Sequence, residues 1–162
     1  MKLDGVNKGI LFLLQQDSRR MTTREMADRV GVSASTVQNR IEKMEDEGII
    51  QGYYPKIDYE KAGLQLHIVF ICHVPHPDRE ALAENAQNVS GVVTVQEVLD
   101  GRENLQIEAV GTNTDDIARV SDELSDLGLT VVNSNVLTNS HVQPFDHFGK
   151  QIVDDPRDDE SN

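Results

Sequence analysis

The side chains best suited to recognise another molecule lie in the stretch that begins at Ser33. Val37, Ile41 and Met44 recur there at the spacing of one helix face, which predicts that this face is buried. Acidic residues outnumber basic ones by 28 to 15 in the chain, yet none lies between Ser33 and Ile41. The other faces carry hydroxyl, amide and basic groups: Ser33, Ser35, Thr36, Gln38, Asn39, Arg40 and Lys43. Because such groups hydrogen-bond to base edges in the major groove of DNA, the pattern predicts a recognition helix.

Two helices joined by a tight turn are needed to present these groups. Thr22 and Glu25 have the spacing of a capping box at the start of a first helix. Gly31 follows as a C-cap residue able to adopt a positive φ, and Ser33 is a favourable N-cap for the second helix. This order is typical of a helix-turn-helix motif. Together with the acid-free second helix, it favours DNA recognition over an ordinary solvated helix face.

Basic side chains around the motif are candidates for contacts with DNA phosphates. Arg20, Lys43 and Lys56 are assigned to this task, although Arg20 is equally well explained as a merely exposed residue. Two other functions stay open. One is an architectural or chromatin protein that binds DNA of any sequence, and the other is a module that senses a metal or another ligand. The hydrogen-bonding face favours sequence reading over indiscriminate coating of the duplex.

The net charge of −13 lies entirely outside the predicted DNA-binding region. Residues 1–61 contain ten basic and ten acidic residues, whereas residues 62–162 contain five and eighteen. Because these acids are scattered, they favour a surface adapted to a salt-rich (halophilic) cytoplasm over a site for a basic partner or metal ions. A single cysteine, Cys72, excludes an internal disulfide, and neither a membrane span nor a signal peptide is predicted. We therefore expect a cytoplasmic protein.

The first domain is expected to span residues 1–61 and to be a winged helix-turn-helix. A helix over 3–16, with Asp4 as its N-cap, has apolar residues at helical spacing and would pack on the motif. A short two-stranded wing is expected over 49–57, and the following segment would link the two halves of the chain.

The second domain is expected to span residues 62–152, followed by an acidic, disordered tail over 153–162. Its periodicities predict strands and helices in the order β-α-β-β-α-β, a ferredoxin-like (ACT-like) domain, so the fold class is α+β. Helices can cover only one face of such a sheet. The other face carries Val69 and Ile71 or the residues that alternate with them, and this apolar surface predicts that a second copy covers it, giving a homodimer.

Three stretches carry a resemblance to a known family: LDGVNKGILFLLQQDSRR, MADRVGVSASTVQNRIEKMEDEGIIQGYYPKID and the turn that contains Gly101. Over residues 3–140 the chain resembles the Lrp/AsnC (feast/famine) family of transcriptional regulators. The resemblance implies a winged helix-turn-helix joined to a ferredoxin-like ligand-binding domain, and dimers that can assemble into octamers. It also implies control of operator binding by amino acids or related small molecules.

The resemblance further implies that the turn formed by Gly101, Arg102, Glu103 and Asn104 helps to bind the effector. Asn104 stands where the family typically has an aspartate, so this position lacks the carboxylate that would pair with an ammonium group. Glu103 is an alternative source of that charge, but on the alternate face of the chain. A different ligand, or none, is therefore an open alternative to an amino acid.

Neither a catalytic site nor a metal site is predicted. His73 and His76 are three residues apart across a strand end and Pro75, which is not the spacing of a helical ligand pair. Cys72 and His73 point to opposite faces of one strand. The sequence contains no recognisable nucleophile–base pair, phosphate-binding glycine loop or carboxylate pair with active-site spacing, so an enzyme and a cofactor are not expected.

Overall fold

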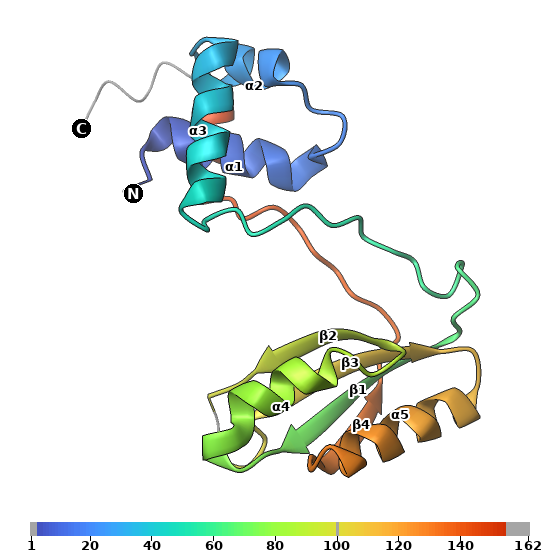
Figure 1. Cartoon of the computed structure of the whole chain (residues 1–162). Helices are drawn as coiled ribbons and strands as arrows, with labels where there is room; N and C mark the ends of the chain where they lie inside the picture. Colours follow the sequence, from blue (N-terminus) through green and yellow to red (C-terminus); the bar gives the residue numbers. More distant parts are fainter. Residues whose placement is uncertain (1–2, 100, 155–162) are drawn as a thin grey trace. The chain divides into compact units, whose positions relative to one another are not determined.

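The computed structural model describes residues 3–99 and 101–154, which fold into two compact units (Figure 1). The first unit consists of the described parts of Met1–Pro55 and His141–Asn162, and the second is Lys56–Ser140. Both ends of the described chain thus belong to one unit. None of the helices that these residues form is long and apolar enough to cross a membrane.

Three helices form the body of the first unit: α1 (Gly5–Asp17), α2 (Thr23–Val30) and α3 (Ala34–Asp46). Each begins at a side chain that accepts a backbone hydrogen bond, which is Asp4, Thr22 or Ser33. Their apolar stripes pack against one another to give a core of Ile10, Leu11, Leu13, Met26, Ala27, Val30, Val37 and Met44. The predicted helix-turn-helix and its first helix are confirmed.

The segment after residue 140 packs on the first unit. α6 (Lys150–Asp154) contacts α1 and α2, and Phe148 and Val153 pack against the core of this unit. The Phe145 N–H donates a 3.1 Å hydrogen bond to Gln15 Oε1 on α1. The end of the described chain therefore completes the domain with which the chain begins.

This packing differs from the predicted domain boundaries, which assigned 62–152 to the second domain and 153–162 to a tail. The physical reason is a close approach between two glycines. A Cβ atom built on Gly149 would lie 2.5 Å from the Gly9 nitrogen, so only glycine lets the start of α6 reach α1. Residues 155–162 of the predicted tail lie outside the residues that the structure describes.

The wing expected over 49–57 is not formed by paired strands. Ile49 and Ile50 pack on the first core, and residues 51–58 have no regular secondary structure. The Tyr53 hydroxyl donates a 2.8 Å hydrogen bond to Glu45 Oε1, and burial and this carboxylate raise the pKa of Tyr53 to about 12. Tyr53 is thus tied to α3 instead of a partner strand.

The second unit is a four-stranded antiparallel sheet with two main helices. Its elements are β1 (Leu66–His73), the short 3-10 helix η1 (His76–Asp78), α4 (Arg79–Ala86), β2 (Val92–Glu97), β3 (Leu105–Gly111), α5 (Thr114–Asp126) and β4 (Thr130–Val136). The strands lie in the order β2-β3-β1-β4, and each neighbouring pair is antiparallel. This arrangement confirms the predicted β-α-β-β-α-β order and the α+β class.

The two faces of this sheet differ. α4 and α5 lie on the same side of it (Figure 1), where Phe70 and Cys72 of β1 are buried. Val69 alternates with these residues, so it lies on the helix-free face, where it is half-buried. His67 Nε2 and Glu108 Oε2, which lie 3.1 Å apart, belong to the same face. This face is therefore a mixture of apolar and polar groups, less apolar than the sequence predicts.

Candidate nucleic-acid interface

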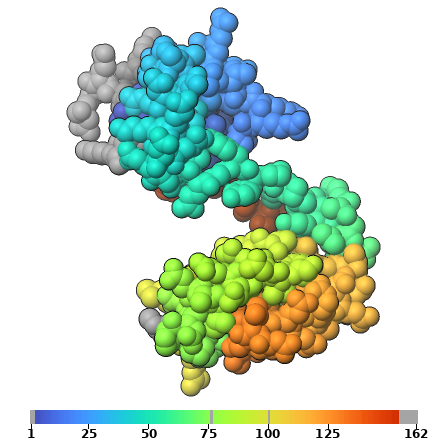
Figure 2. All heavy atoms as spheres, in the orientation of Figure 1, coloured from blue at the N-terminus to red at the C-terminus, as the bar shows by residue number. Residues whose placement is uncertain are grey.

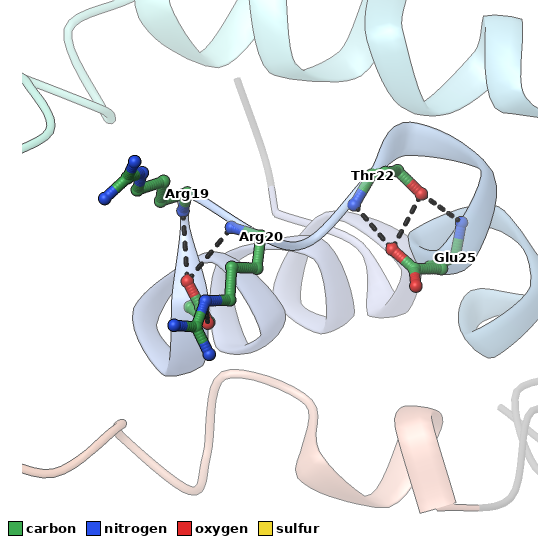
Figure 3. Close-up of polar contacts among 5 residues, drawn as sticks. Arg19, Arg20, Thr22 and Glu25 are labelled. Carbon is green, nitrogen blue, oxygen red and sulfur yellow. Dashed lines mark hydrogen bonds and ion pairs between the residues drawn. The ribbon is translucent and has the colours of Figure 1, made fainter.

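The start of α2 is held by a reciprocal capping box (Figure 3). Thr22 Oγ1 accepts a 3.2 Å hydrogen bond from the Glu25 N–H, while the Glu25 carboxylate accepts hydrogen bonds from the Thr22 N–H at 2.8 Å and the Thr22 hydroxyl at 2.7 Å. These bonds keep the pKa of Glu25 below its ordinary value. The box fixes where α2 begins, and hence where the following turn falls.

We expect Thr22→Ala to lower the free energy of unfolding of the first unit by about 1 kcal/mol, because the Glu25 N–H loses its acceptor. Thr23→Ala is the matched control, since Thr23 is also exposed but caps nothing. Urea unfolding of both variants gives the comparison. Equal losses for the two would show that the cap does not hold the helix.

The turn between α2 and α3 brings three hydroxyl groups to one helix end. Gly31 ends α2 in the left-handed region, with φ 72° and ψ 30°, which favours glycine. Ser33 caps α3 by accepting a 3.1 Å hydrogen bond from the Thr36 N–H. Its hydroxyl oxygen also lies 3.0 Å from Ser35 Oγ and 2.8 Å from Thr36 Oγ1. The N-terminus of a helix carries partial positive charge, so this cluster suits an anionic partner.

The first half of α3 presents a neutral polar face to solvent. Ser35, Gln38 and Asn39 are exposed, and Figure 2 shows atoms of α3, in cyan, at the surface of the first unit. The Gln38 amide donates a 3.1 Å hydrogen bond to Glu42 Oε1, the first acid along the helix. The structure thus places most of the predicted base-reading residues together on one accessible surface.

Arg40 differs from this pattern, because its guanidinium turns towards α1. Arg40 Nη1 lies 2.5 Å from Asp4 Oδ2 and 2.9 Å from Asn7 Oδ1. Partial burial raises the pKa of Asp4, but the hydrogen bonds and the charge of Arg40, with the bond from the Asn7 N–H, lower it below its ordinary value. The sequence predicts Arg40 as a base reader, whereas the structure uses its guanidinium to join two helices. Asp4 and Asn7 are partners that the sequence analysis did not find.

The cations predicted to contact phosphates have different surroundings. The Arg20 side chain is 89% exposed, with its Nε 4.0 Å from Asp17 Oδ2. Lys43 is 62% exposed, with its Nζ 4.0 Å from Glu47 Oε1. Such long, solvated ion pairs are weak and are readily exchanged for another anion. Lys56 instead belongs to the second unit, where its Nζ donates a 2.8 Å hydrogen bond to the Ser140 carbonyl oxygen.

Comparison with known proteins shows which kind of domain carries this surface. The family model for winged helix-turn-helix DNA-binding domains matches residues 3–51. An uncharacterized HTH-type transcriptional regulator of Pyrococcus furiosus is 46% identical over 66 residues, which are 41% of this chain and only 44% of that relative. A second such regulator, from Pyrococcus abyssi, is 30% identical over 113 residues, covering 70% of this chain and 72% of the relative. The leucine-responsive regulatory protein of Rhizobium meliloti is 29% identical over 115 residues, covering 70% and 73%.

Solved structures share this fold over most of the chain. The structure of AsnC from E. coli has a TM-score of 0.69 at 18% identity and covers 90% of this chain and 98% of that one. The chain belongs to the Lrp/AsnC family. A regulator from Neisseria meningitidis, solved in complex with L-methionine, has a TM-score of 0.73 at 23% identity, covering 88% and 96%.

The turn between β2 and β3, which the sequence predicts as an effector site, is built around Asn104. Its side chain is 4% exposed. Its Oδ1 accepts a 3.0 Å hydrogen bond from the Val74 N–H, and its Nδ2 donates a 2.9 Å hydrogen bond to the Val74 carbonyl oxygen. Gly101, Arg102 and Glu103 are exposed. Asn104, one of the four residues predicted to bind an effector, therefore ties the turn to the end of β1. The other three residues are at the surface.

Metal-binding groups do not cluster in the part of the chain that the structure describes. No group of three or more His, Cys, Asp and Glu side chains there could hold an ion. Cys72 is buried, which raises the pKa of its thiol to about 11. His73 Nδ1 is buried without a hydrogen-bond partner. These two side chains alternate along β1, so they do not converge on one site.

Proposed function

We propose that this chain is a sequence-specific regulator of transcription that binds double-stranded DNA through the first half of α3. One observation carries the proposal: the exposed side of this half consists of neutral hydrogen-bonding groups and contains no acid. Ser35, Thr36, Gln38 and Asn39 read base edges in the major groove, where an amide can donate to and accept from one adenine.

Contacts with phosphates set the register of α3 in the groove. The exposed cations Arg20 and Lys43 contact the backbone, and Ser33 adds a hydroxyl group at the helix N-terminus. Such contacts weaken as salt rises, because releasing the same counterions into a saltier solution gains less entropy. If the acidic second half is adapted to a salt-rich cytoplasm, base contacts must carry a larger share of the binding free energy.

The test is to select binding sites from random duplex DNA and to measure Asn39→Ala on the enriched sequence. We expect a loss of about 1–3 kcal/mol that is confined to one or two base positions, because one amide reads one base pair. Electrophoretic mobility shifts with every single-base variant of the site measure the loss of affinity at each base position.

Lys43→Gln is the matched control on the same helix face. It should weaken binding to all sequences alike. It should also make the plot of log K against log salt less steep, by about 0.9 for each phosphate contact that is lost. A uniform loss for Asn39→Ala as well would contradict base reading and favour an architectural protein that grips only the backbone.

A homodimer is part of the same proposal. Two copies would place their α3 helices about 34–36 Å apart, on the two halves of a near-palindromic site. The helix-free face of the sheet, with half-buried Val69 and Ile71, is the proposed contact, and octamers would assemble from such dimers. Sedimentation equilibrium measures the assembly directly, and a monomer at micromolar concentration would remove this part of the proposal.

Control by a small effector, such as an amino acid, is the remaining part. The similar fold of the regulator from Neisseria meningitidis that binds L-methionine supports it. In this chain the exposed Gly101, Arg102 and Glu103 would meet the effector, while Asn104 holds the turn in place. Titration calorimetry with each amino acid tests it, and absence of heat for all of them would exclude an amino-acid effector without affecting DNA binding.

A further inference from the structure

Within the predicted reading set, Arg40 is the residue whose charged group bonds to another helix of the same unit. A single nitrogen, Nη1, bonds to Asp4 Oδ2 and Asn7 Oδ1 across 36 and 33 residues of chain. Asn7 is 2% exposed, and the Arg40 side chain is 31% exposed. The contact therefore joins the recognition helix to the start of α1 at the edge of the core.

The position of this contact, at the N-terminus of α1, makes the Arg40 guanidinium dependent on Asp4. The N-terminus of α1 carries partial positive charge, so a cation beside it is unfavourable unless an anion lies between them. Asp4 supplies that anion and also caps α1, since its Oδ1 accepts a 2.8 Å hydrogen bond from the Asn7 N–H. Arg40 is thus held by two acceptors whose positions α1 itself fixes.

Apolar packing alone restrains the rotation of α3 about its axis less than the hydrogen bonds of Arg40 do. Val37 and Met44 are buried and so determine which face of α3 points inward. Hydrophobic contacts have no preferred direction, so a small rotation of the helix changes the burial of these side chains little. A hydrogen bond weakens steeply as its angle changes. Arg40 borders this buried face, and Asn39, the preceding residue, lies about 100° away around the helix. A rotation that moved Asn39 would therefore break the bonds of Arg40.

We propose that Arg40 is a positioning residue, which fixes the rotation of α3 through Asp4 and Asn7 so that Asn39 and its neighbours meet their bases. The inference rests on the proposed function, and it replaces a direct contact between Arg40 and DNA. It makes the first turn of α1, far from the recognition helix in sequence, a determinant of specificity.

Two single variants and their combination test this inference in the full chain. Asp4→Asn removes the charge that holds Arg40 but keeps a good N-cap, and Arg40→Gln removes the cation. The measurement is the affinity for the selected duplex divided by that for random duplex, at several salt concentrations. Thermal melting by circular dichroism confirms that each variant is folded at the temperature of the measurement.

Each variant should lower this ratio by about tenfold, an effect similar to losing one base contact. The double variant should be no worse than either single variant, and Arg40→Lys should recover most of the ratio because an ammonium group can still reach Asp4. The slope of log K against log salt should stay at the wild-type value, because no phosphate contact is lost.

Three results would overturn the inference. In the first, Arg40→Gln weakens binding to both duplexes alike and lowers the salt slope by about 0.9, while Asp4→Asn changes neither, which would place Arg40 on a phosphate. In the second, the variants melt earlier but keep the wild-type ratio, which would leave Arg40 a purely structural role. In the third, the wild-type protein prefers no sequence, and then the proposed function fails together with the inference. Only this third result affects the proposed function.

Discussion

Asn104→Ala is expected to lower the free energy of unfolding of the second unit by about 2–4 kcal/mol, because it leaves two buried groups without partners. The Asn104 amide satisfies both the N–H and the carbonyl oxygen of Val74, a residue that is 0% exposed. Alanine replaces neither bond, and both groups of Val74 lie in the buried core. Urea unfolding followed by circular dichroism measures the loss.

Asn88→Ala is the matched control. The Asn88 amide also bonds to a backbone carbonyl oxygen, that of Glu84, but this pair is exposed and water can replace it. We expect a change within about 0.5 kcal/mol, as for other surface substitutions. If Asn104→Ala were as mild as this control, the β2–β3 turn would not depend on its link to β1, and Asn104 would again be available to an effector.

Gly149→Ala is expected to detach α6 from α1 and to destabilise the first unit by about 2–4 kcal/mol, because partly buried apolar side chains on and beside α6 lose their contacts. The new Cβ atom would lie 2.5 Å from the Gly9 nitrogen and 2.8 Å from the Lys8 carbonyl carbon, both backbone atoms that cannot move aside. The φ of 88° adds strain for any residue with a side chain. Faster hydrogen exchange of the α1 amides would report the loss.

Gly48→Ala is the control that separates backbone strain at a positive φ from the steric clash of a new Cβ atom. Gly48 also has a positive φ, 68°, but a Cβ atom built there meets nothing within 4 Å. Its loss should be about 1–2 kcal/mol, the strain alone. Equal effects at both glycines would mean that the docking of the C-terminal segment on α1 contributes little to the stability of the DNA-binding unit.

Local patterns predicted those parts of the fold that are decided locally. The caps at Asp4, Thr22 and Ser33 and the turn at Gly31 all depend on residues within a few positions of one another. For this reason the helix-turn-helix and the order of the second unit could be predicted without any tertiary information. The exposed polar face of α3 could also be predicted, because the period of a helix determines which residues share a face.

The differences arise where the partner lies far along the chain. Arg40 sits between the buried and the polar sides of α3, and its direction is decided by Asp4 and Asn7, more than thirty residues away. Asparagine is a common turn residue, so the sequence around Asn104 predicts a turn. The role of its side chain depends on Val74, to which it hydrogen-bonds thirty residues away. The apolar residues near the end of the chain indicate packing, yet nothing in their spacing says which unit they pack on.

The central claim is that the first half of α3 lies in a DNA groove, and site-directed cleavage tests it most directly. Ala34 is the exposed first residue of α3 and is not among the proposed base readers. Ala34→Cys can carry an iron chelate that cuts nearby DNA, because Cys72, the one native cysteine, is buried with a raised pKa. Asp122→Cys, on the exposed side of α5, is the control.

We predict that the chelate at position 34 cuts the selected duplex at two clusters about one helical turn apart, while the chelate at position 122 gives no localised cutting. Diffuse or absent cutting from position 34 on a duplex that the protein demonstrably occupies would contradict the account, because some other surface would then hold the DNA.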